Sequence, residues 1–253
     1  IVVRHGPRLS RGTPLCNTPG VRACALLAVV LVTLASTTAN TGARLPKADP
    51  GAAKSAPVGG PTGLAVGPDG AVWFTLPDRN AIGRISPRGR VRLFAADSVR
   101  RPWDIARGSN GDLWFTNRGN STVGRITVDG RITAVDVGGG LREPLSITSS
   151  GDGSVWFTDR GNNSIGRVTR SGELLVYPAL SISAPTGISV GPDGAIWFTN
   201  VGSDTLGRVS GDGVVTRIRP ASLKGPRNLA LGPDGALWVT NVESAMRIRT
   251  GEI

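Results

Sequence analysis

Histidine and cysteine are almost missing from this 253-residue chain. The single histidine, His5, and the two cysteines, Cys16 and Cys24, all stand within the first 24 residues. From residue 61 onward, therefore, no disulfide and no thiolate zinc site can form. That region also has none of the side chains that most often serve as general base, thiol nucleophile or transition-metal ligand.

A hydrophobic run long enough to span a membrane is also missing. The longest apolar stretch, residues 23–35, follows Arg22 and has thirteen residues, short of the roughly twenty that a spanning helix needs. A basic residue, a short apolar run and small residues near 39 or 43 are typical of an export signal. We expect a leader over 1–43, with Val21 as an alternative start, and a secreted or cell-envelope protein. The alternative is a membrane anchor, so membrane contact is expected only through an uncleaved leader.

The net charge of +11 is concentrated in the leader and in repeated positions. Residues 61–253 hold 22 basic and 17 acidic residues, and four of the arginines recur once per repeat. They stand in the same Gly-Arg-Ile/Val context at 84, 125, 167 and 208. No basic helix or aromatic-basic platform is present in the sequence, which argues against nucleic acid as a partner.

What is abundant is repetition. Five tryptophans stand 41 or 42 residues apart, each in a copy of one pattern: Trp73, Trp114, Trp156, Trp197 and Trp238. Each copy opens on a proline and contains an Asp-Gly or Asn-Gly hairpin signal between two short strand-like runs. In the first copy the expected strands are 64–66, 72–75, 81–85 and 90–94. A period near forty with four strands per unit predicts a β-propeller, with the tryptophans packed between blades.

The predicted fold is therefore all-β, a propeller of about five four-stranded blades over 61–253. The fifth unit ends in its third strand, at 245–249. The connector, 44–60, holds a candidate closing strand near residues 43–45. Without that strand the blades would remain an open arc or assemble with another copy.

Two segments resemble the virginiamycin B lyase (streptogramin lyase) family: Gly-Pro-Asp-Gly-Ala-Ile-Trp-Phe-Thr-Asn at 191–200, and Leu-Gly-Arg-Val at 206–209. NHL-type repeats are similar in a more general way. The resemblance implies a propeller, seven-bladed in characterised members. It also implies a magnesium-dependent elimination that opens a cyclic depsipeptide antibiotic at its ester.

The family places a catalytic histidine directly after the opening proline of late repeats, a glutamate before that proline, and another glutamate shortly after the tryptophan. After the five prolines this chain has Thr62, Trp103, Leu145, Thr186 and Arg227. Gly225 precedes the last proline, and the glutamate nearest to Trp238 on its C-terminal side is Glu243. Arginine stays protonated and cannot act as the base. We therefore assign no catalytic residue.

A ligand is expected where the first strand of each unit begins and the second ends, because an antiparallel hairpin brings these ends to one rim. The candidate rim residues are Thr62, Trp103, Asp104, Thr186 and Arg227. Trp103 is placed to stack on a sugar or planar ligand, or else to plug the channel. Arg227 could bind a carboxylate or phosphate, or remain a solvated charge.

One repeated position after the second strand carries oxygen-bearing side chains: Asn117, Asp159, Asn200 and Asn241. Such a set could hold Mg²⁺ or Ca²⁺, resembling gluconolactonase-type propellers. The alternative, which the single carboxylate favours, is that these residues bond their own turn backbone.

Two functions remain. The first is a binding module that takes a small molecule, peptide or glycan at the channel mouth. The second is a metal-dependent lyase or lactonase with a rearranged site that uses Asp104, Glu143, Asp159 or Glu243.

Overall fold

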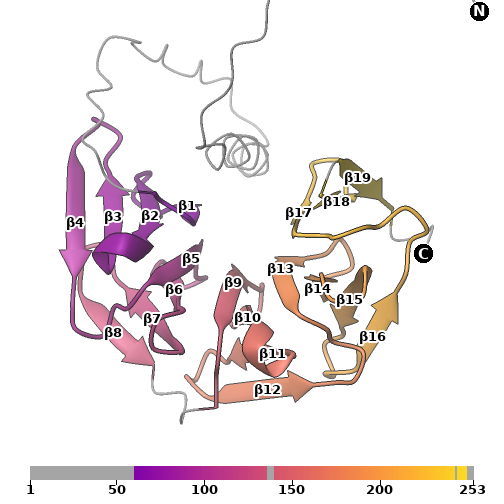
Figure 1. Ribbon diagram of the computed structural model, residues 1–253. Helices are drawn as coiled ribbons and strands as arrows, with labels where there is room; N and C mark the ends of the chain where they lie inside the picture. The colour runs from indigo at the N-terminus through magenta and orange to yellow at the C-terminus, as the bar shows by residue number, and fades with distance from the viewer. Residues whose placement is uncertain (1–59, 136–139, 243, 250–253) are drawn as a thin grey trace, which may run out of the picture.

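The computed structural model describes residues 60–135, 140–242 and 244–249, so the expected leader and nearly all of the connector lie outside the described residues. Within these residues the protein is built of antiparallel sheets, together with the single-turn 3-10 helices η1 (Pro77–Arg79) and η2 (Arg160–Asn162). The sheets follow one another in chain order around a common axis (Figure 1). They do not close into a ring: the first and the fifth stand at the two ends of an arc.

The first sheet comprises β1 (Leu64–Val66), β2 (Val72–Leu76), β3 (Ala81–Ile85) and β4 (Val91–Ala95). The second comprises β5 (Pro102–Arg107), β6 (Leu113–Asn117), β7 (Thr122–Ile126) and β8 (Ile132–Val135). The third sheet comprises β9 (Pro144–Ser149), β10 (Val155–Asp159), β11 (Ser164–Val168) and β12 (Leu174–Pro178). The fourth comprises β13 (Pro185–Val190), β14 (Ile196–Asn200), β15 (Thr205–Val209) and β16 (Val215–Ile218). The fifth has β17 (Asn228–Leu231), β18 (Leu237–Thr240) and β19 (Ala245–Ile248). These bounds confirm the expected strands of the first repeat to within one residue. Within the described residues the fifth sheet has three strands, as expected.

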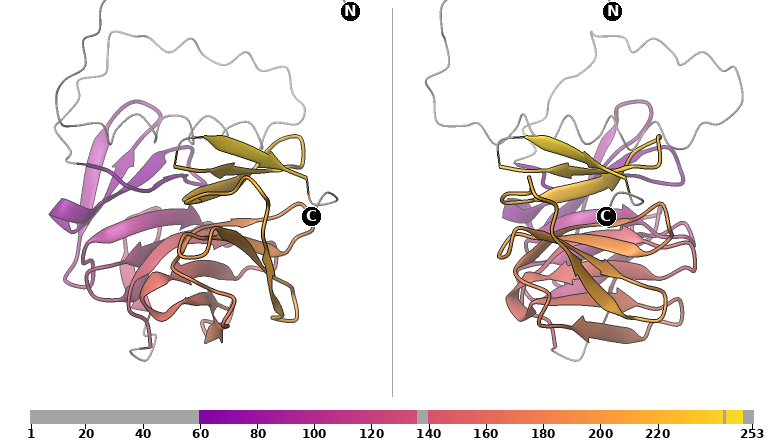
Figure 2. Two further views of the ribbon diagram at one scale, coloured as in Figure 1. Left: turned by 45° about the vertical axis from the view of Figure 1, so that its right-hand side comes forward. Right: turned by 90° about the vertical axis from the view of Figure 1, so that its right-hand side faces the viewer.

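The strands of each sheet run outward from the axis in chain order. First strands of neighbouring sheets pack against one another, from β1 to β17, and so form the inner wall of the arc. The turned views show the sheets twisted and stacked face to face (Figure 2). The predicted hairpin turns join the first and second strands, and Gly70, Gly111 and Gly194 take there the positive φ that glycine adopts without strain.

Each sheet packs on its neighbours through two different faces. We call the face that carries the repeated tryptophan the Trp face, and the opposite face, which carries Phe74 or its counterpart, the Phe face. In each of the four contacts, the Trp face of one sheet meets the Phe face of the next. In the first contact Trp73 and Ile82 pack against Phe115 and Ile126. Equivalent apolar clusters fill the other three contacts. Four of the five recurring tryptophans therefore pack between blades as predicted, whereas Trp238, in the fifth sheet, is 41% exposed.

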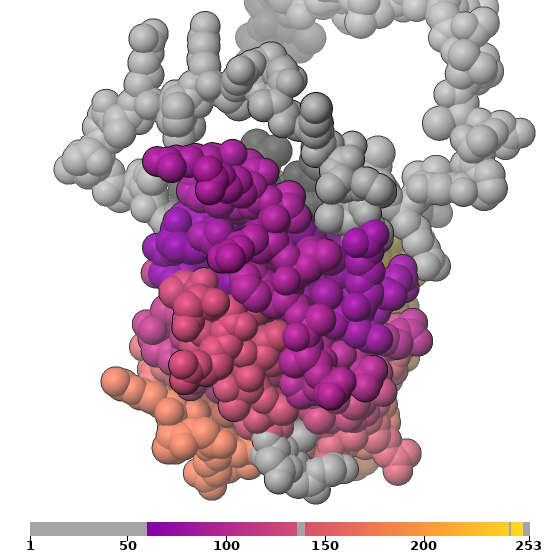
Figure 3. Space-filling model, turned by 90° about the vertical axis from the view of Figure 1, so that its left-hand side faces the viewer, coloured from indigo at the N-terminus to yellow at the C-terminus, as the bar shows by residue number. Residues whose placement is uncertain are grey.

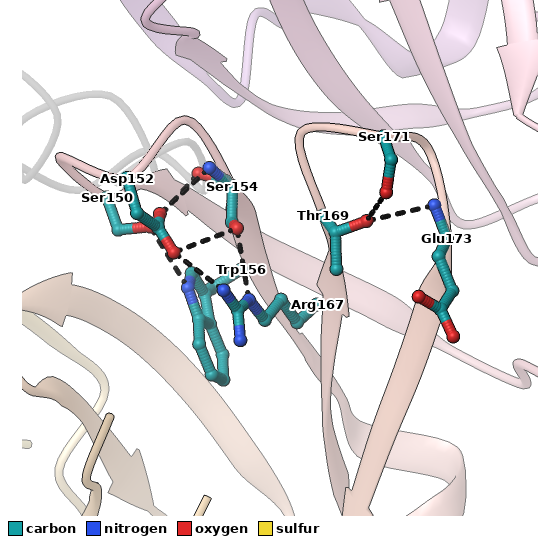
Figure 4. Close-up of polar contacts among 8 residues, drawn as sticks. All are labelled: Ser150, Asp152, Ser154, Trp156, Arg167, Thr169, Ser171 and Glu173. Carbon is teal, nitrogen blue, oxygen red and sulfur yellow. Dashed lines mark hydrogen bonds and ion pairs between the residues drawn. The ribbon is translucent and has the colours of Figure 1, made fainter. Parts of the chain in front are cut away.

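The recurring arginines belong to the scaffold, as the repeat predicts. In the third sheet Arg167 donates to Asp152 Oδ2 at 2.6 Å, and its guanidinium lies 5.0 Å from the Trp156 ring centroid. Asp152 also accepts the amide of Ser154 at 2.9 Å, which holds the hairpin turn (Figure 4). Arginine, aspartate and tryptophan thus fix the turn to the strands at the rim opposite to the one expected to bind a ligand.

Candidate ligand-binding rim

The ends of the first two strands of each sheet meet at one rim, as expected. Pro102 pairs with Asn117, Pro144 with Asp159, and Pro185 with Asn200, each across a register shift. The residues that follow the opening prolines therefore occupy one row along the arc. Neighbouring members of this row are tied together by threonines.

A buried threonine near the end of the second strand makes this tie in the first four sheets. Thr75 Oγ1 donates to the carbonyl of Trp103 at 2.8 Å, and Thr158 Oγ1 donates to that of Thr186 at 2.8 Å. Thr116 and Thr199 make the same bond to Leu145 and Arg227. All four threonines are fully buried. They hold the rim positions of consecutive sheets in register, a role that sequence reasoning missed although Trp-Phe-Thr recurs in four of the repeats.

Trp103 is the centre of a polar-aromatic cluster that spans the second and third sheets. The Arg118 guanidinium lies 5.1 Å from the Trp103 ring centroid and forms an ion pair with Glu143. All three side chains are half-buried. We call these three residues the rim cluster. An indole face beside a charge-paired arginine offers a ligand a stacking surface and a directed hydrogen-bond donor.

Asp104, next to Trp103, turns into the wall instead of toward the ligand row. Its Oδ1 accepts the amide of Ile105 at 2.8 Å, and its Oδ2 accepts the amide of Ile147 in the third sheet at 3.1 Å. Burial raises the pKa of Asp104 to about 6, although these two amides act to lower it. A carboxyl with this pKa exchanges protons near neutrality and also links two sheets.

The row contains Thr62, Thr186 and Arg227, as expected. The two threonine side chains are hydrogen-bonded within the wall, whereas the arginine side chain is exposed. The hydroxyls of Thr62 and Thr186 donate to the carbonyls of the next rim residues, Trp103 and Arg227. They serve the contacts between sheets. The Arg227 side chain, in contrast, is exposed, at the far end of the row from Thr62.

Three of the candidate metal ligands are fully buried, and their polar atoms are engaged by their own sheets. Asn117 Oδ1 accepts the amide of Arg100, and Asn200 Oδ1 accepts that of Ser183. The Asp159 carboxylate accepts the amides of Arg142 and Glu143. The side chains thus bond backbone, as in the alternative reading, but the backbone of the loop before the first strand and not that of their own turn. Side chains engaged in this way do not fit a magnesium or calcium site.

Asn241 differs, because its buried Oδ1 has no hydrogen-bond partner. Glu243 lies outside the described residues. Over residues 60–135, 140–242 and 244–249, no group of three or more His, Cys, Asp or Glu side chains could hold a metal ion. No helix in this part of the chain is long and apolar enough to cross a membrane.

Arg118 is the functional candidate that sequence reasoning missed. It lies one residue after β6, at a position where the third repeat has Arg160 and the other repeats have no arginine. It contacts Trp103 of β5 and Glu143, just before β9, because the rim brings these segments together. The available signal was weak: the odd tryptophan at 103 and the glutamate before Pro144 were both visible, but nothing in the sequence placed an arginine between them.

Fold and rim together define a β-propeller, in which four of the five blades repeat one Trp-Phe-Thr strand. The chain belongs to the virginiamycin B lyase family, whose profile matches residues 51–249. A virginiamycin B lyase of Bordetella pertussis is 57% identical over 42 residues, 15% of this chain and 14% of that protein. One of Saccharopolyspora erythraea is 45% identical over 42 residues, 17% of this chain and 14% of that protein. These matches span only a small part of the curated relatives' length.

Solved structures extend the likeness over the whole arc. A catalytically inactive virginiamycin B lyase from Staphylococcus aureus, crystallised with quinupristin, superposes with a TM-score of 0.71 at 32% identity. The match covers 76% of this chain and 68% of that one. A gluconolactonase of Xanthomonas campestris superposes with a TM-score of 0.60 at 18% identity, over 74% of this chain and 71% of that one, and shares the fold alone.

Proposed function

We propose that this propeller binds a peptide ligand at its rim and does not open the ligand by elimination. The observation that carries the proposal is the rim cluster: Trp103, Arg118 and Glu143, half-buried together where two sheets meet. Stacking on the indole and hydrogen bonding to the guanidinium suit a peptide that has a planar ring and a backbone or terminal carboxylate. A small molecule or glycan with the same groups would use the same contacts.

The composition of the rim supports the proposed loss of elimination. An ester elimination needs a base that removes a carbon-bound proton, with a pKa near neutrality. Residues 61–253 contain no histidine, and Glu143, the glutamate at the rim, is held in an ion pair with Arg118. This pair directs a carboxylate oxygen of Glu143 to the arginine, away from a substrate proton.

Quinupristin is a suitable first probe, because it is the ligand named with the similar lyase structure. We expect calorimetry to show binding that weakens about tenfold or more in Trp103→Ala and in Arg118→Ala. Arg88→Ala, an exposed arginine far from the rim, is the matched control and should bind as the parent does. Mass spectrometry with added Mg²⁺ should show only the cyclic compound. Binding that is unchanged in both rim variants would refute the site, and a linear product would refute the loss of catalysis.

A second candidate function is a lyase or lactonase that uses Asp104. The observation in its favour is the pKa of this carboxyl, about 6, which suits proton transfer near neutrality. Turnover of quinupristin or of an aldonolactone that disappears in Asp104→Asn, with thermal stability retained, would favour this function over binding alone.

We also propose that the protein is exported, on the strength of the sequence pattern in 1–43. Mass spectrometry of protein recovered from the culture medium should find an N-terminus near residue 40 or 44. A chain that retains its apolar run and sediments with membranes would indicate an anchor instead.

A further inference from the structure

The second and third sheets enclose a cavity of about 350 Å³ at the rim that carries the hairpin turns. We call this space the turn cavity. It is lined by residues of both sheets: Ser109, Trp114, Arg125, Thr169, Arg170 and Gly172. The two sheets pack against each other along the arc (Figure 3), and the rim cluster lies at the opposite ends of their strands.

At the junctions on either side, an aromatic ring from the outer strand covers the repeated tryptophan. Phe94 of β4 stacks on Trp73 with ring centroids 5.4 Å apart. Tyr177 of β12 stacks on Trp156 in the same way, at 5.3 Å. Both tryptophans are buried, so each ring completes the cover of the indole beside it.

The same two rings reach the outer turn of the following sheet. A Cβ on Gly130 would overlap the ring of Phe94, and a Cβ on Gly213 would stand 2.7 Å from the ring of Tyr177. The corresponding glycine of the third sheet is Gly172, where a Cβ would meet none of the described atoms within 4 Å. The space in front of this glycine is therefore open.

Val135 stands where the first and third sheets have the aromatic ring. It pairs with Val123 as Phe94 pairs with Ile82 in the first sheet. Its side chain is shorter than an aromatic one, and Trp114 is only half-buried. The turn cavity thus takes the place that a ring occupies at the neighbouring junctions, and a planar ring suits the indole face.

The indole N–H of Trp114 also differs from those of other repeats. In the fourth sheet Trp197 Nε1 donates to the turn carboxylate of Asp193 at 3.0 Å, and the first sheet has the equivalent bond. The second sheet has Asn110 in place of this aspartate. Trp114 Nε1 donates to no acceptor in the described part of the chain, so it remains able to bond a ligand.

The charges around the turn cavity favour an anion. Asp152, the one carboxylate among its described lining residues, is paired with Arg167 at 2.6 Å. Arg125 is paired with Asp112 at 3.0 Å. Arg170 is exposed and forms no ion pair with a described residue. Its guanidinium is therefore the group that can bind a carboxylate.

We propose that the turn cavity is a second ligand site, which binds a small aromatic carboxylate. The aromatic ring packs against Trp114, where the other sheets supply a phenylalanine or tyrosine, and the carboxylate pairs with Arg170. The volume lies within the range of small-molecule sites. The proposal does not depend on the rim cluster or on the function proposed for it.

Calorimetry with 2-naphthoate tests the site on the full chain carrying Trp103→Ala, which removes the stacking surface of the rim cluster. We expect saturable binding. Arg170→Ala should weaken it about tenfold or more, because a charged hydrogen bond is lost. The neutral analogue 2-naphthamide should bind more weakly by a similar factor. Arg88→Ala, an exposed arginine in the corresponding turn of the first sheet, is the matched control and should leave the affinity unchanged.

Val135→Phe gives an independent measurement, since it supplies the ring that the neighbouring junctions have. It should abolish the binding of 2-naphthoate while the chain still melts cooperatively. Val135→Ile introduces the residue type that the fourth sheet has at this position, Ile218, and should leave binding intact. The proposal would be overturned by absence of binding, by equal affinity for the amide, or by binding that persists in both Arg170→Ala and Val135→Phe. If Val135→Phe does not melt cooperatively, Arg170→Ala and the amide decide.

Discussion

The ring of Phe157 lies across Gly166 in the neighbouring strand, so close that a Cβ on residue 166 would stand 2.1 Å from the ring. The first, second and fourth sheets repeat this relation between their phenylalanine and glycine. In the fifth sheet, Val239 stands where the phenylalanine would be, and Met246 stands in place of the glycine. A smaller side chain on one strand is thus accompanied by a larger one on the next, and the volume between blades is conserved.

Gly166→Ala should destabilise the protein by about 1–3 kcal/mol, because the new methyl group must displace a buried aromatic ring. Urea unfolding followed by tryptophan fluorescence measures the loss. Gly151→Ala is the matched control, since a Cβ there meets no atom within 4 Å. Equal stability of the two variants would show that the ring yields freely.

The fifth sheet has valine and methionine in place of phenylalanine and glycine, and the third sheet should tolerate the same pair of substitutions. Gly166→Met alone should be more damaging than Gly166→Ala, and adding Phe157→Val should recover part of the loss. A double-mutant cycle measured by urea unfolding gives the coupling energy, expected at about 1 kcal/mol or more for residues in contact. Additive losses would mean that the two positions do not share one space.

Thr158→Val should cost about 1–3 kcal/mol, because it leaves two groups without their partner: the carbonyl of Thr186 and the amide of Ser146. Thr240→Val removes the same hydroxyl from the exposed end of the arc, where water replaces it. Its loss should stay within about 0.5 kcal/mol. Thermal melts of both variants test the difference, and similar losses would contradict the role given to the buried ties.

Asp104 should make stability fall as pH rises from about 4 to about 6. Its pKa is about 6 in the folded protein and near 3.8 when the chain is unfolded, so the folded state binds the extra proton in this interval. The contribution present at pH 4 is therefore lost by pH 7, by roughly 2 kcal/mol. Asp104→Asn should remove this part of the pH dependence in thermal melts, whereas Asn228→Asp, at the exposed counterpart position, should not add it.

Much of the architecture could be predicted because the same pattern of strands and turns occurs five times in the sequence. Alternation along Val72-Trp-Phe-Thr75 and the Asp-Gly turns define strands and hairpins locally, and five copies define a blade array. Side-chain direction was harder to foresee. Asn117 and Asn200 stand at the predicted rim, yet their side-chain oxygens accept the backbone amides of Arg100 and Ser183, in the loop before the first strand of their sheet. The ion pair between Arg118 and Glu143 depends on how the second and third sheets approach each other, which no local pattern encodes.

The uniform joint between Trp and Phe faces has a consequence for how this protein evolves. Since every junction uses the same pair of surfaces, duplicating or deleting one whole forty-residue module would leave all remaining junctions chemically intact. Recombination that adds or removes whole repeats could thus lengthen or shorten the arc of sheets without changing the apolar contacts between them. Only the modules that carry odd residues, such as Trp103, would then distinguish one descendant from another.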